Sequence, residues 1–451
     1  MQSTKSTALN RALLISIRTP DLKDGEAEES LAELSRLVTT LGFKVVGTQS
    51  QRQASTKRLT VVGSGKLKEL ADLTGNKGND DHTDTITDDH INDEAEEDID
   101  EKAYLNDPTE LADVVVFDCD LSSSQLRNVE NALGVEVFDR TGVIIEIFSR
   151  HARTRTARLQ VEIARLNYLS PRLRESGSGN NERQMGRGAG ESSLELDRRK
   201  VRDKLGDLKR ELVAVQAEMK GRRTQRADNY CVALVGYTNA GKSSMMRALT
   251  GSEVLVENKL FATLDTTVRA LYPETQPRIL VSDTVGFIKK LPHDLVASFH
   301  STLDEAHEAS LLLYVVDAAD PGFRSQLTVV NEVLQEIGVD DSQKLLLLNK
   351  SDQLNDQQKE KLLQEFPDAV QLSTRNPVDI SALRECIITF SERDMIEEEI
   401  IVPYTAKGII GDIRGNMRVI KEDYDESCTR LLVRARALDL ERVKKMLKDD
   451  N

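Results

Sequence analysis

The first 150 residues alternate short apolar runs with stretches of helical periodicity. Because an apolar run can form a buried strand and a periodic stretch can cover the resulting sheet as a helix, this alternation predicts an α/β domain. The runs predicted as strands lie at residues 13–17, 45–49, 59–62, 114–117 and 143–148. The stretches predicted as helices lie at residues 28–41 and 125–133.

Residues 151–227 have the pattern of two long helices joined by a glycine-rich loop, so we predict an antiparallel helical hairpin. We expect the first helix to end near Pro171, since proline disrupts a helix interior. The second helix carries apolar residues spaced alternately by four and three positions from Val201 onward, which is typical of a helix with a partner. The loop holds Arg183 and Arg187, and it is either a flexible tip or a mobile basic finger whose backbone can approach phosphates.

A chain of 451 residues is too long for a single hydrophobic core. Strand and helix patterns alternate again over residues 228–395, and residues 396–451 predict a small α+β domain. We therefore expect an α/β protein of four parts: an N-terminal α/β domain at residues 1–150, the hairpin at 151–227, a second α/β domain at 228–395 and the small C-terminal domain.

The formal net charge of −15 is distributed unevenly along the chain. Twelve acidic residues and no Lys or Arg lie between residues 79 and 101, and we predict that residues 75–108 form a disordered acidic insertion. This insertion is either a solvating surface loop or an electrostatic guard over a basic surface. Residues 150–226 hold twenty Lys and Arg against ten Asp and Glu, so the hairpin can meet a polyanion although the whole chain is acidic.

The content of 39% hydrophobic and 30% charged residues indicates a soluble globular protein, and no apolar run approaches the roughly 18 residues of a membrane span. The cysteines form no CxxC or Cys/His cluster, so neither a zinc site nor a disulfide framework is indicated, and a reducing cytoplasm fits best. They are Cys119, Cys231, Cys386 and Cys428. The first twenty residues are basic and lack acids, which leaves an organelle transit peptide as the alternative, although residues 12–17 read better as a buried strand.

An apolar run at residues 231–235 leads into Gly236-Tyr237-Thr238-Asn239-Ala240-Gly241-Lys242-Ser243, and a helix-like stretch follows. This segment matches GxxxxGK[ST], the phosphate-binding loop (P-loop), in its strand–loop–helix context. The two glycines let the backbone wrap so that successive N–H groups point at phosphate oxygens. We expect Lys242 to reach the β- and γ-phosphates and Ser243 to bind the Mg²⁺ that bridges them.

Two further motifs follow predicted strands. Asp283 can hold the Mg²⁺ shell, and Gly286 follows at DxxG spacing and can offer an N–H to the γ-phosphate. Residues 349–352 form an NKxD motif, in which the Asp352 carboxylate can accept from both the ring N–H and the exocyclic amine of guanine. Adenine offers neither donor there, and an unpaired buried carboxylate rejects the wrong base by on the order of 10⁴-fold. The sequence therefore predicts a site for GTP.

The chain resembles the HflX family, of the Obg–HflX group of translation-associated P-loop GTPases. The resemblance rests on GYTNAGKSS, LFATLD, SDTVGFI and NKSD, in matching order and spacing, and it extends upstream over residues 139–174 and 186–205. It implies that residues 228–395 form a GTP-hydrolysing G domain that uses Mg²⁺. It also implies that the N-terminal domain and the hairpin bind the large ribosomal subunit and its RNA. Members of the family separate or rescue ribosomes, often under stress, and we expect a cytoplasmic monomer without a membrane span.

The resemblance also implies roles for individual residues. Thr263 stands where the family has the first-switch threonine that binds Mg²⁺ when the γ-phosphate is present. The implied metal ligands are Ser243, Thr263 and Asp283, and the implied catalytic residues are Lys242, Thr263 and Gly286. Beyond the P-loop, the expected nucleotide contacts are Phe261, Ala262, Thr263, Leu264, Asp265, Asp283, Thr284, Val285, Gly286, Asn349, Lys350, Ser351, Asp352, Ser373, Thr374 and Arg375. Residues 373–375 read Ser-Thr-Arg where the family usually has Ser-Ala, and Thr266 stands where many members have proline.

The residue that follows the DxxG motif affects the expected rate of GTP hydrolysis. Ras-like enzymes have a glutamine there that orients the attacking water, and this chain has Phe287. We therefore expect slow hydrolysis by the chain alone and stimulation on the ribosome. Two rival functions remain: an RNA-modifying or ribosome-assembly GTPase, which needs a further catalytic group, and a GTP-dependent ribosome-binding scaffold with little turnover.

Overall fold

The computed structural model describes residues 10–20, 24–53, 56, 58–76, 111–175, 193–224, 229–252, 260–261, 266–290, 305–339, 343–393, 395–406 and 408–449. The predicted insertion beyond Asn76 and the glycine-rich loop at residues 176–192 lie outside these ranges. The chain divides into two compact units. One comprises residues 1–215 together with 289–298, and the other comprises residues 216–288 and 299–451.

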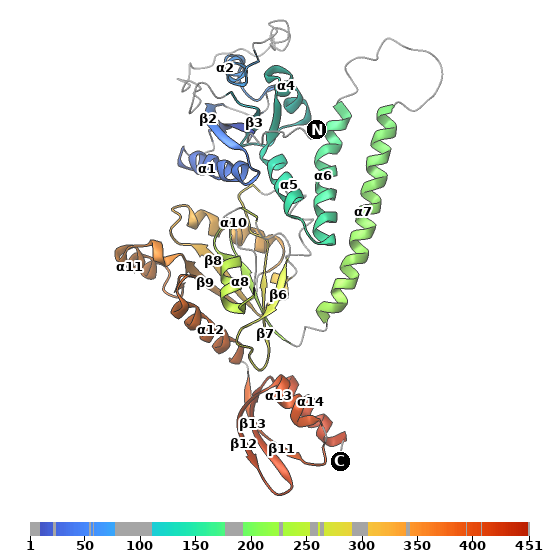
Figure 1. Cartoon of the computed structure of the whole chain (residues 1–451), viewed down its shortest axis with the longest axis vertical. Coiled ribbons are helices and arrows are strands. Elements are labelled where there is room, and N and C mark those ends of the chain that lie inside the picture. Colours follow the sequence, from blue (N-terminus) through green and yellow to red (C-terminus); the bar gives the residue numbers. More distant parts are fainter. Residues whose placement is uncertain are drawn as a thin grey trace, which may run out of the picture. The chain divides into compact units, whose positions relative to one another are not determined.

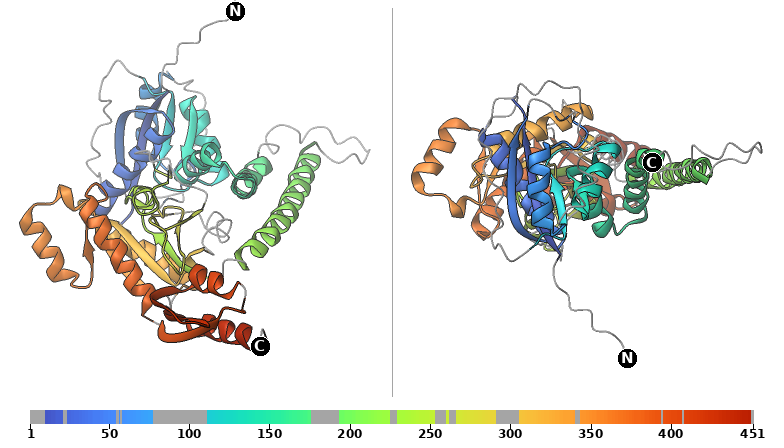
Figure 2. Two further views of the ribbon diagram at one scale, coloured as in Figure 1. Left: turned by 60° about the horizontal axis from the view of Figure 1, so that its bottom comes forward. Right: turned by 90° about the horizontal axis from the view of Figure 1, so that it is seen from above.

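The first unit contains a parallel sheet of four strands in the order β2-β1-β3-β4. Figure 1 labels two of these strands, β2 and β3, and the helices around them. The strands are β1 (Arg11–Arg18), β2 (Lys44–Arg52), β3 (Val114–Phe117) and β4 (Glu136–Asp139). The helices around this sheet are α1 (Asp24–Thr40), α2 (Ser64–Thr74), α4 (Ser123–Leu133) and α5 (Arg140–His151). Figure 2 shows the sheet and its helices from two further directions. The chain runs from β1 to β2 towards one edge of the sheet and from β3 to β4 towards the other edge. The carboxyl ends of β1 and β3 therefore form the switch point, which is where α/β sheets usually bind ligands.

The hydrophobic core explains why these segments fold. Side chains that alternate along β1 and β3, such as Leu13 and Val115, pack with Leu70 of α2 and Val129 of α4. The buried face of α1 contacts β1 and β2, and α1 also contacts α5. The alternating apolar runs therefore form the predicted α/β domain, because each helix covers one face of a parallel sheet.

Two predicted strands in this domain are wrong. Residues 59–62 form a turn, and residues 143–148 lie inside helix α5. A short apolar run cannot be distinguished from a buried helix by its pattern alone. The distinguishing signal is Asp139, whose side chain accepts from the Gly142 amide and caps the start of α5. Strand β4, which directly precedes this cap, was not predicted.

The predicted hairpin consists of α6 (Arg155–Glu175) and α7 (Ser193–Thr224). Ion pairs link Arg155 to Glu211 and Lys204 to Glu162 at 2.8 Å each, and the reversed order of the partners makes the helices antiparallel, as predicted. The prediction that α6 ends near Pro171 is wrong, because the helix continues to Glu175. A proline so close to the end of a helix removes a single backbone hydrogen bond, which the last turn can tolerate.

The second unit contains a six-stranded sheet in the order β10-β9-β8-β5-β7-β6, in which only the edge strand β6 is antiparallel. Its strands are β5 (Tyr230–Val235), β6 (Thr267–Ala270), β7 (Ile279–Asp283), β8 (Leu311–Asp317), β9 (Gln343–Asn349) and β10 (Val370–Gln371). Its helical elements include α8 (Lys242–Thr250), α10 (Phe323–Glu336), η1 (Ser351–Gln353), α11 (Asp356–Glu365) and α12 (Pro377–Glu392). The strands at the centre are almost continuously apolar and buried, as expected for a sheet covered on both faces.

The same unit contains a three-stranded antiparallel sheet in the order β11-β13-β12. Its elements are β11 (Ile396–Pro403), α13 (Ile409–Asn416), β12 (Arg418–Tyr424), β13 (Cys428–Ala435) and α14 (Ala437–Asp449). One face of the sheet forms a small core with the two helices, around Leu431, Ile413 and Leu440. The structure therefore has the α/β architecture with a small α+β part that the sequence predicted. Among the described helices, none combines the length and hydropathy of a membrane span.

Candidate functional site

The loop between β5 and α8 has the backbone that the P-loop sequence predicts. Gly236 and Gly241 both have positive φ, and a Cβ atom at Gly236 would collide with the carbonyl oxygen of Val315. Any residue other than glycine would therefore push the loop away from β8. Residues 237, 238 and 240 are buried as well, so the loop is a tight turn at the end of a central strand.

Lys242 lies folded over this turn with 6% of its surface exposed. Its Nζ donates to the carbonyls of Gly236 at 3.0 Å and of Tyr237 at 2.7 Å. Burial lowers the pKa of Lys242 to about 8, and the nearby charge of Asp283 acts in the opposite direction. A phosphate group next to this amine would supply the negative charge that its burial requires.

Ser243 and Asp283 come from α8 and from the end of β7, and the structure brings them together. The Ser243 hydroxyl donates to Oδ2 of Asp283 at 2.9 Å, and Asp283 is completely buried. Strands β5 and β7 are parallel neighbours, so their carboxyl ends place the two residues side by side. A hydroxyl beside a carboxylate is an oxygen donor set of the kind that Mg²⁺ prefers, so the residues present fit this ion.

The DxxG segment lies directly against the P-loop. The Phe287 N–H donates to the carbonyl of Gly236 at 3.2 Å, and the Phe287 carbonyl accepts from the amide of Thr238 at 2.9 Å. At Gly286 an added Cβ would lie 2.9 Å from Cγ2 of Thr238 and 3.0 Å from Nζ of Lys242. A side chain at position 286 would therefore crowd Thr238 and the lysine amine. The ring of Phe287 is buried, with 3% of the residue exposed.

The NKxD segment is linked to the P-loop and to the loop after β10. Nδ2 of Asn349 donates to the Ala240 carbonyl at 2.8 Å, and Oδ1 of Asn349 accepts from the Thr374 amide at 3.3 Å. One side chain therefore fixes the distance between the phosphate end and the base end of the predicted site. Lys350 forms an ion pair with Asp317, a residue that the motifs did not indicate because no pattern marks the end of β8.

The Asp352 carboxylate is oriented by residues of the segment at 373–375. The Ser373 hydroxyl donates to Oδ1 of Asp352 at 2.7 Å, and the Arg375 guanidinium lies 3.5 Å from Oδ2. The amide of Ser373 in turn donates to Asp379 at 2.8 Å, a contact that the sequence did not reveal. Arg375 therefore adds an exposed ion pair beside the carboxylate predicted to read the base.

The remaining predicted contacts are placed only in part. Thr284 is buried and donates to the Leu234 carbonyl at 2.7 Å, and Val285 is buried beside it. Phe261 is buried with a positive φ of 58°, whereas Ala262, Thr263, Leu264 and Asp265 lie outside the described residues. The structure thus brings together the P-loop, DxxG and NKxD residues.

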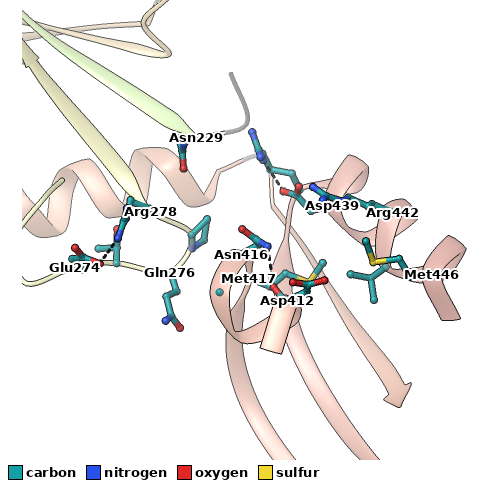
Figure 3. Close-up of a pocket in the computed structure, with 15 residues that line it drawn as sticks. Asn229, Glu274, Gln276, Arg278, Asp412, Asn416, Met417, Asp439, Arg442 and Met446 are labelled. Atoms are coloured by element: carbon teal, nitrogen blue, oxygen red, sulfur yellow. Dashed lines mark hydrogen bonds and ion pairs between the residues drawn. The ribbon is translucent and has the colours of Figure 1, made fainter. Parts of the chain in front are cut away.

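A second concave site in this unit has different chemistry (Figure 3). It has a volume of about 440 Å³, and its lining includes Glu274, Arg278, Arg436 and Asp439. These charges pair with one another, at 2.9 Å between Arg278 and Glu274 and at 2.8 Å between Arg436 and Asp439. None of the predicted nucleotide contacts lines this pocket, so it is separate from the nucleotide site.

Comparison with known proteins agrees with this geometry. Family profiles described as "GTP-binding GTPase N-terminal", "GTP-binding GTPase Middle Region" and "50S ribosome-binding GTPase" match residues 28–105 with 96–149, 151–226 and 231–350, respectively. GTPase HflX of Gluconacetobacter diazotrophicus is 55% identical over 443 residues, which cover 97% of each chain. The chain belongs to the HflX family of GTPases. The family predicted from the motifs is therefore confirmed, and this HflX-family chain binds guanine nucleotides and hydrolyses GTP.

The chain is also similar to other proteins. GTPase HflX of Alkalihalophilus pseudofirmus is 35% identical over 454 residues, covering 100% of this chain and 99% of its own. GTPase HflX of Escherichia coli K12 is 37% identical over 352 residues, covering 77% and 74%, respectively. A GTP-binding protein from Sulfolobus solfataricus, solved in complex with GDP, covers 85% of this chain and 99% of its own at 23% identity, with a TM-score of 0.43.

Proposed function

We propose that this GTPase associates with the large ribosomal subunit and uses GTP binding and hydrolysis as a switch in ribosome splitting, rescue or recycling under stress. The match of residues 231–350 to a family described as "50S ribosome-binding GTPase" carries the proposal. The hairpin supports it, because α7 exposes basic side chains such as Arg202 and Lys209 along its length. Such a surface suits the phosphates of ribosomal RNA.

At the nucleotide, the P-loop amides and Lys242 hold the β- and γ-phosphates. Ser243 and Asp283, with Thr263 from the first switch, would hold Mg²⁺, which would offset the negative charge of the phosphates. Gly286 donates its N–H to the γ-phosphate, and Asp352, oriented by Ser373, selects guanine. The catalytic residues in this scheme are Lys242, Thr263 and Gly286, and the remaining residues of the three motifs provide binding contacts.

Phe287 accounts for the dependence on the ribosome in this proposal. Its backbone is paired with the P-loop on both sides and its ring is buried, so it offers no group that can orient the attacking water. The chain alone is then slow, and contact with the large subunit completes the site. We further propose that the protein acts as a monomer in the cytoplasm, with domains divided as the sequence indicated, at residues 150, 227 and 395.

The test is GTP turnover by the purified chain with and without large ribosomal subunits. Stimulation by large subunits, and not by small subunits, supports the proposal. Absence of turnover in both conditions with retained GTP binding indicates a scaffold, and turnover that RNA alone stimulates equally well favours an RNA-modifying GTPase. Sucrose-gradient profiles of 70S ribosomes with a non-hydrolysable GTP analogue then distinguish splitting from binding alone.

A further inference from the structure

Thr238, in the middle of the P-loop, carries a buried hydroxyl. The residue is 7% exposed, and its Oγ1 has no hydrogen-bond partner among the residues that the structure describes. Buried polar atoms without a partner are uncommon in native proteins, because each lowers the stability of the fold. This hydroxyl therefore requires an explanation, and contact with a bound group is one that its position supports.

Two buried hydroxyls close to Thr238 are already paired with the main chain. Ser282, on β7, donates to the Val232 carbonyl at 3.3 Å. Thr284, which follows β7, donates to the Leu234 carbonyl at 2.7 Å. These two hydroxyls serve the fold, whereas the hydroxyl of Thr238 is available to a ligand.

The side chain of Thr238 lies beside the two groups that we assign to the γ-phosphate. A Cβ atom at Gly286 would lie 2.9 Å from Cγ2 of Thr238 and 3.0 Å from Nζ of Lys242. Oγ1 and Cγ2 of a threonine are attached to the same carbon atom, so the hydroxyl belongs to this small region. All three residues lie in the second unit. The hydroxyl, the Lys242 amine and the Gly286 N–H are therefore neighbouring donors.

The main chain holds the Thr238 side chain in place. Its N–H donates to the Phe287 carbonyl at 2.9 Å, and the preceding residue, Tyr237, forms an isolated parallel bridge with Phe287. Threonine is also restricted at χ1, because two heavy atoms are attached to its Cβ. The hydroxyl is therefore a preorganised donor, which needs little rearrangement at the moment of reaction.

Hydrolysis of GTP places charge where such a donor can act. The oxygen of a water molecule forms a bond to the γ-phosphorus, the bond from this phosphorus to the β–γ bridging oxygen breaks, and GDP leaves with the electron pair. A proton of the water passes to a γ-phosphate oxygen. The γ-phosphoryl oxygens carry negative charge throughout, and donors stabilise it. Phe287 has no polar side-chain group to contribute, whereas a hydroxyl donates one hydrogen bond in whichever direction the acceptor lies.

We propose that the Thr238 hydroxyl is a further catalytic group of this GTPase, which donates a hydrogen bond to an oxygen of the γ-phosphoryl group during its transfer to water. It acts beside the Lys242 amine and the Gly286 N–H. The proposal rests on the γ-phosphate contacts proposed above for these two groups, and it does not depend on ribosome binding. GDP has no γ-phosphoryl group, so the hydroxyl takes no part in GDP binding.

The test compares variants of Thr238 with the parent chain in single-turnover GTP hydrolysis without ribosomes. Thr238→Val keeps the shape of the side chain and removes the hydroxyl, whereas Thr238→Ser keeps the hydroxyl and removes the methyl group. We expect hydrolysis to be slower by about tenfold or more in Thr238→Val, because loss of one donor to a transition-state charge has at least this effect. The rate of Thr238→Ser should stay within about threefold of the parent rate. Thr238→Ala, which has neither group, should be as slow as Thr238→Val.

Binding measurements separate catalysis from ground-state contact. The affinities of Thr238→Val for GDP and for a non-hydrolysable GTP analogue should stay within about threefold of the parent values, since a catalytic contact is stronger in the transition state than in bound GTP. Thermal unfolding should find Thr238→Val at least as stable as the parent chain, because the substitution removes a buried polar atom without a partner.

Thr250→Val is the matched control. It makes the same chemical change at a buried threonine whose hydroxyl donates to the Met246 carbonyl at 2.7 Å, and it should leave the hydrolysis rate unchanged. An unchanged rate in Thr238→Val would overturn the proposal. An equally slow Thr238→Ser would do the same, as would a loss of analogue affinity in Thr238→Val as large as its loss of rate. Stimulation by large ribosomal subunits is a separate measurement, so failure of the proposed ribosomal function is distinguishable from failure of this proposal.

Discussion

The amide of Thr238 donates to the carbonyl of Phe287 at 2.9 Å, which joins the middle of the P-loop to the residue after the DxxG motif. The Phe287 N–H returns a bond to Gly236 at 3.2 Å, so the two segments form a short parallel bridge. The phosphate end of the site and the switch segment thus share one piece of backbone structure. A change in either segment should therefore affect the other.

Phe287 should contribute to stability through its buried ring. Phe287→Ala removes a side chain that is 3% exposed, and such truncations lower the free energy of unfolding by about 3–5 kcal/mol. Phe287→Leu, which keeps most of the volume, should lower it by less than about 1.5 kcal/mol. Denaturant unfolding followed through the GTPase domain measures both values. Equal stabilities of the Ala variant and the parent chain would show that the ring is not part of the core.

Nucleotide binding should take up a proton at pH 8–9. The pKa of Lys242 is about 8 in the chain without nucleotide, and a bound phosphate should raise it, because the negative charge favours the ammonium form. At pH 8.5 much of the amine is then neutral before binding and charged afterwards, whereas at pH 7 it is mostly charged in both states. Calorimetry in buffers of different ionisation enthalpy measures the uptake. A proton balance that does not change between pH 7 and pH 8.5 would contradict the assignment.

The same shift determines how stability depends on pH. The pKa of Lys242 lies below its unfolded value of 10.5, so the unfolded chain binds more protons between about pH 8 and 10.5. The charged form of this buried amine therefore destabilises the nucleotide-free fold below about pH 8, and this cost declines as the pH rises through the window. Lys242→Met removes this cost together with the two hydrogen bonds of the amine, so the stability of the variant relative to the parent chain should be higher at pH 7 than at pH 9.5. Thermal unfolding of the two chains at both pH values measures this change.

Asp352→Asn should change the base preference of the site from guanine to xanthine. The amide presents a donor where guanine presents its exocyclic amine, so GTP affinity should fall by about 10³-fold or more, and xanthosine triphosphate, which has a carbonyl there, should bind better. Ser373→Ala removes one neutral donor to the carboxylate and should weaken GTP binding by only about tenfold. Competition with a fluorescent guanine nucleotide measures all three affinities. Unchanged GTP affinity in Asp352→Asn would remove this residue from base recognition.

Binding to the large subunit should weaken steeply with salt if the hairpin contacts RNA. The slope of log affinity against log salt is negative, and each lost phosphate contact makes it shallower by roughly one. Lys209→Gln on α7 should therefore reduce both the affinity and the slope. Lys361→Gln on α11 removes the same charge from an exposed position of another helix and serves as the control. Co-sedimentation between about 50 and 200 mM salt provides the measurement, and a flat profile would exclude the hairpin as the RNA-binding element.

The sequence alone determined the chemistry of the nucleotide site and the general architecture. The P-loop, DxxG and NKxD motifs are each local in the sequence, and the positive φ of Gly236 and Gly241 marks them as turn glycines, although the close approach of Val315 to Gly236 comes from the tertiary structure. The alternation of apolar runs was likewise enough to predict α/β domains. It misassigned residues 143–148, because a fully buried helix and a buried strand have the same apolar pattern.

Only the tertiary structure decided which distant residues come together within each unit. The contacts of Ser243 with Asp283, of Arg375 with Asp352 and of Arg140 with the Lys289 carbonyl join residues 40, 23 and 149 positions apart. Such pairs depend on the order of strands in a sheet and on how helices pack against it, and neither is encoded in a local pattern. Arg140 in particular looks like an ordinary basic residue in the sequence, and only the structure shows that its guanidinium is buried between Glu33 and Asp118.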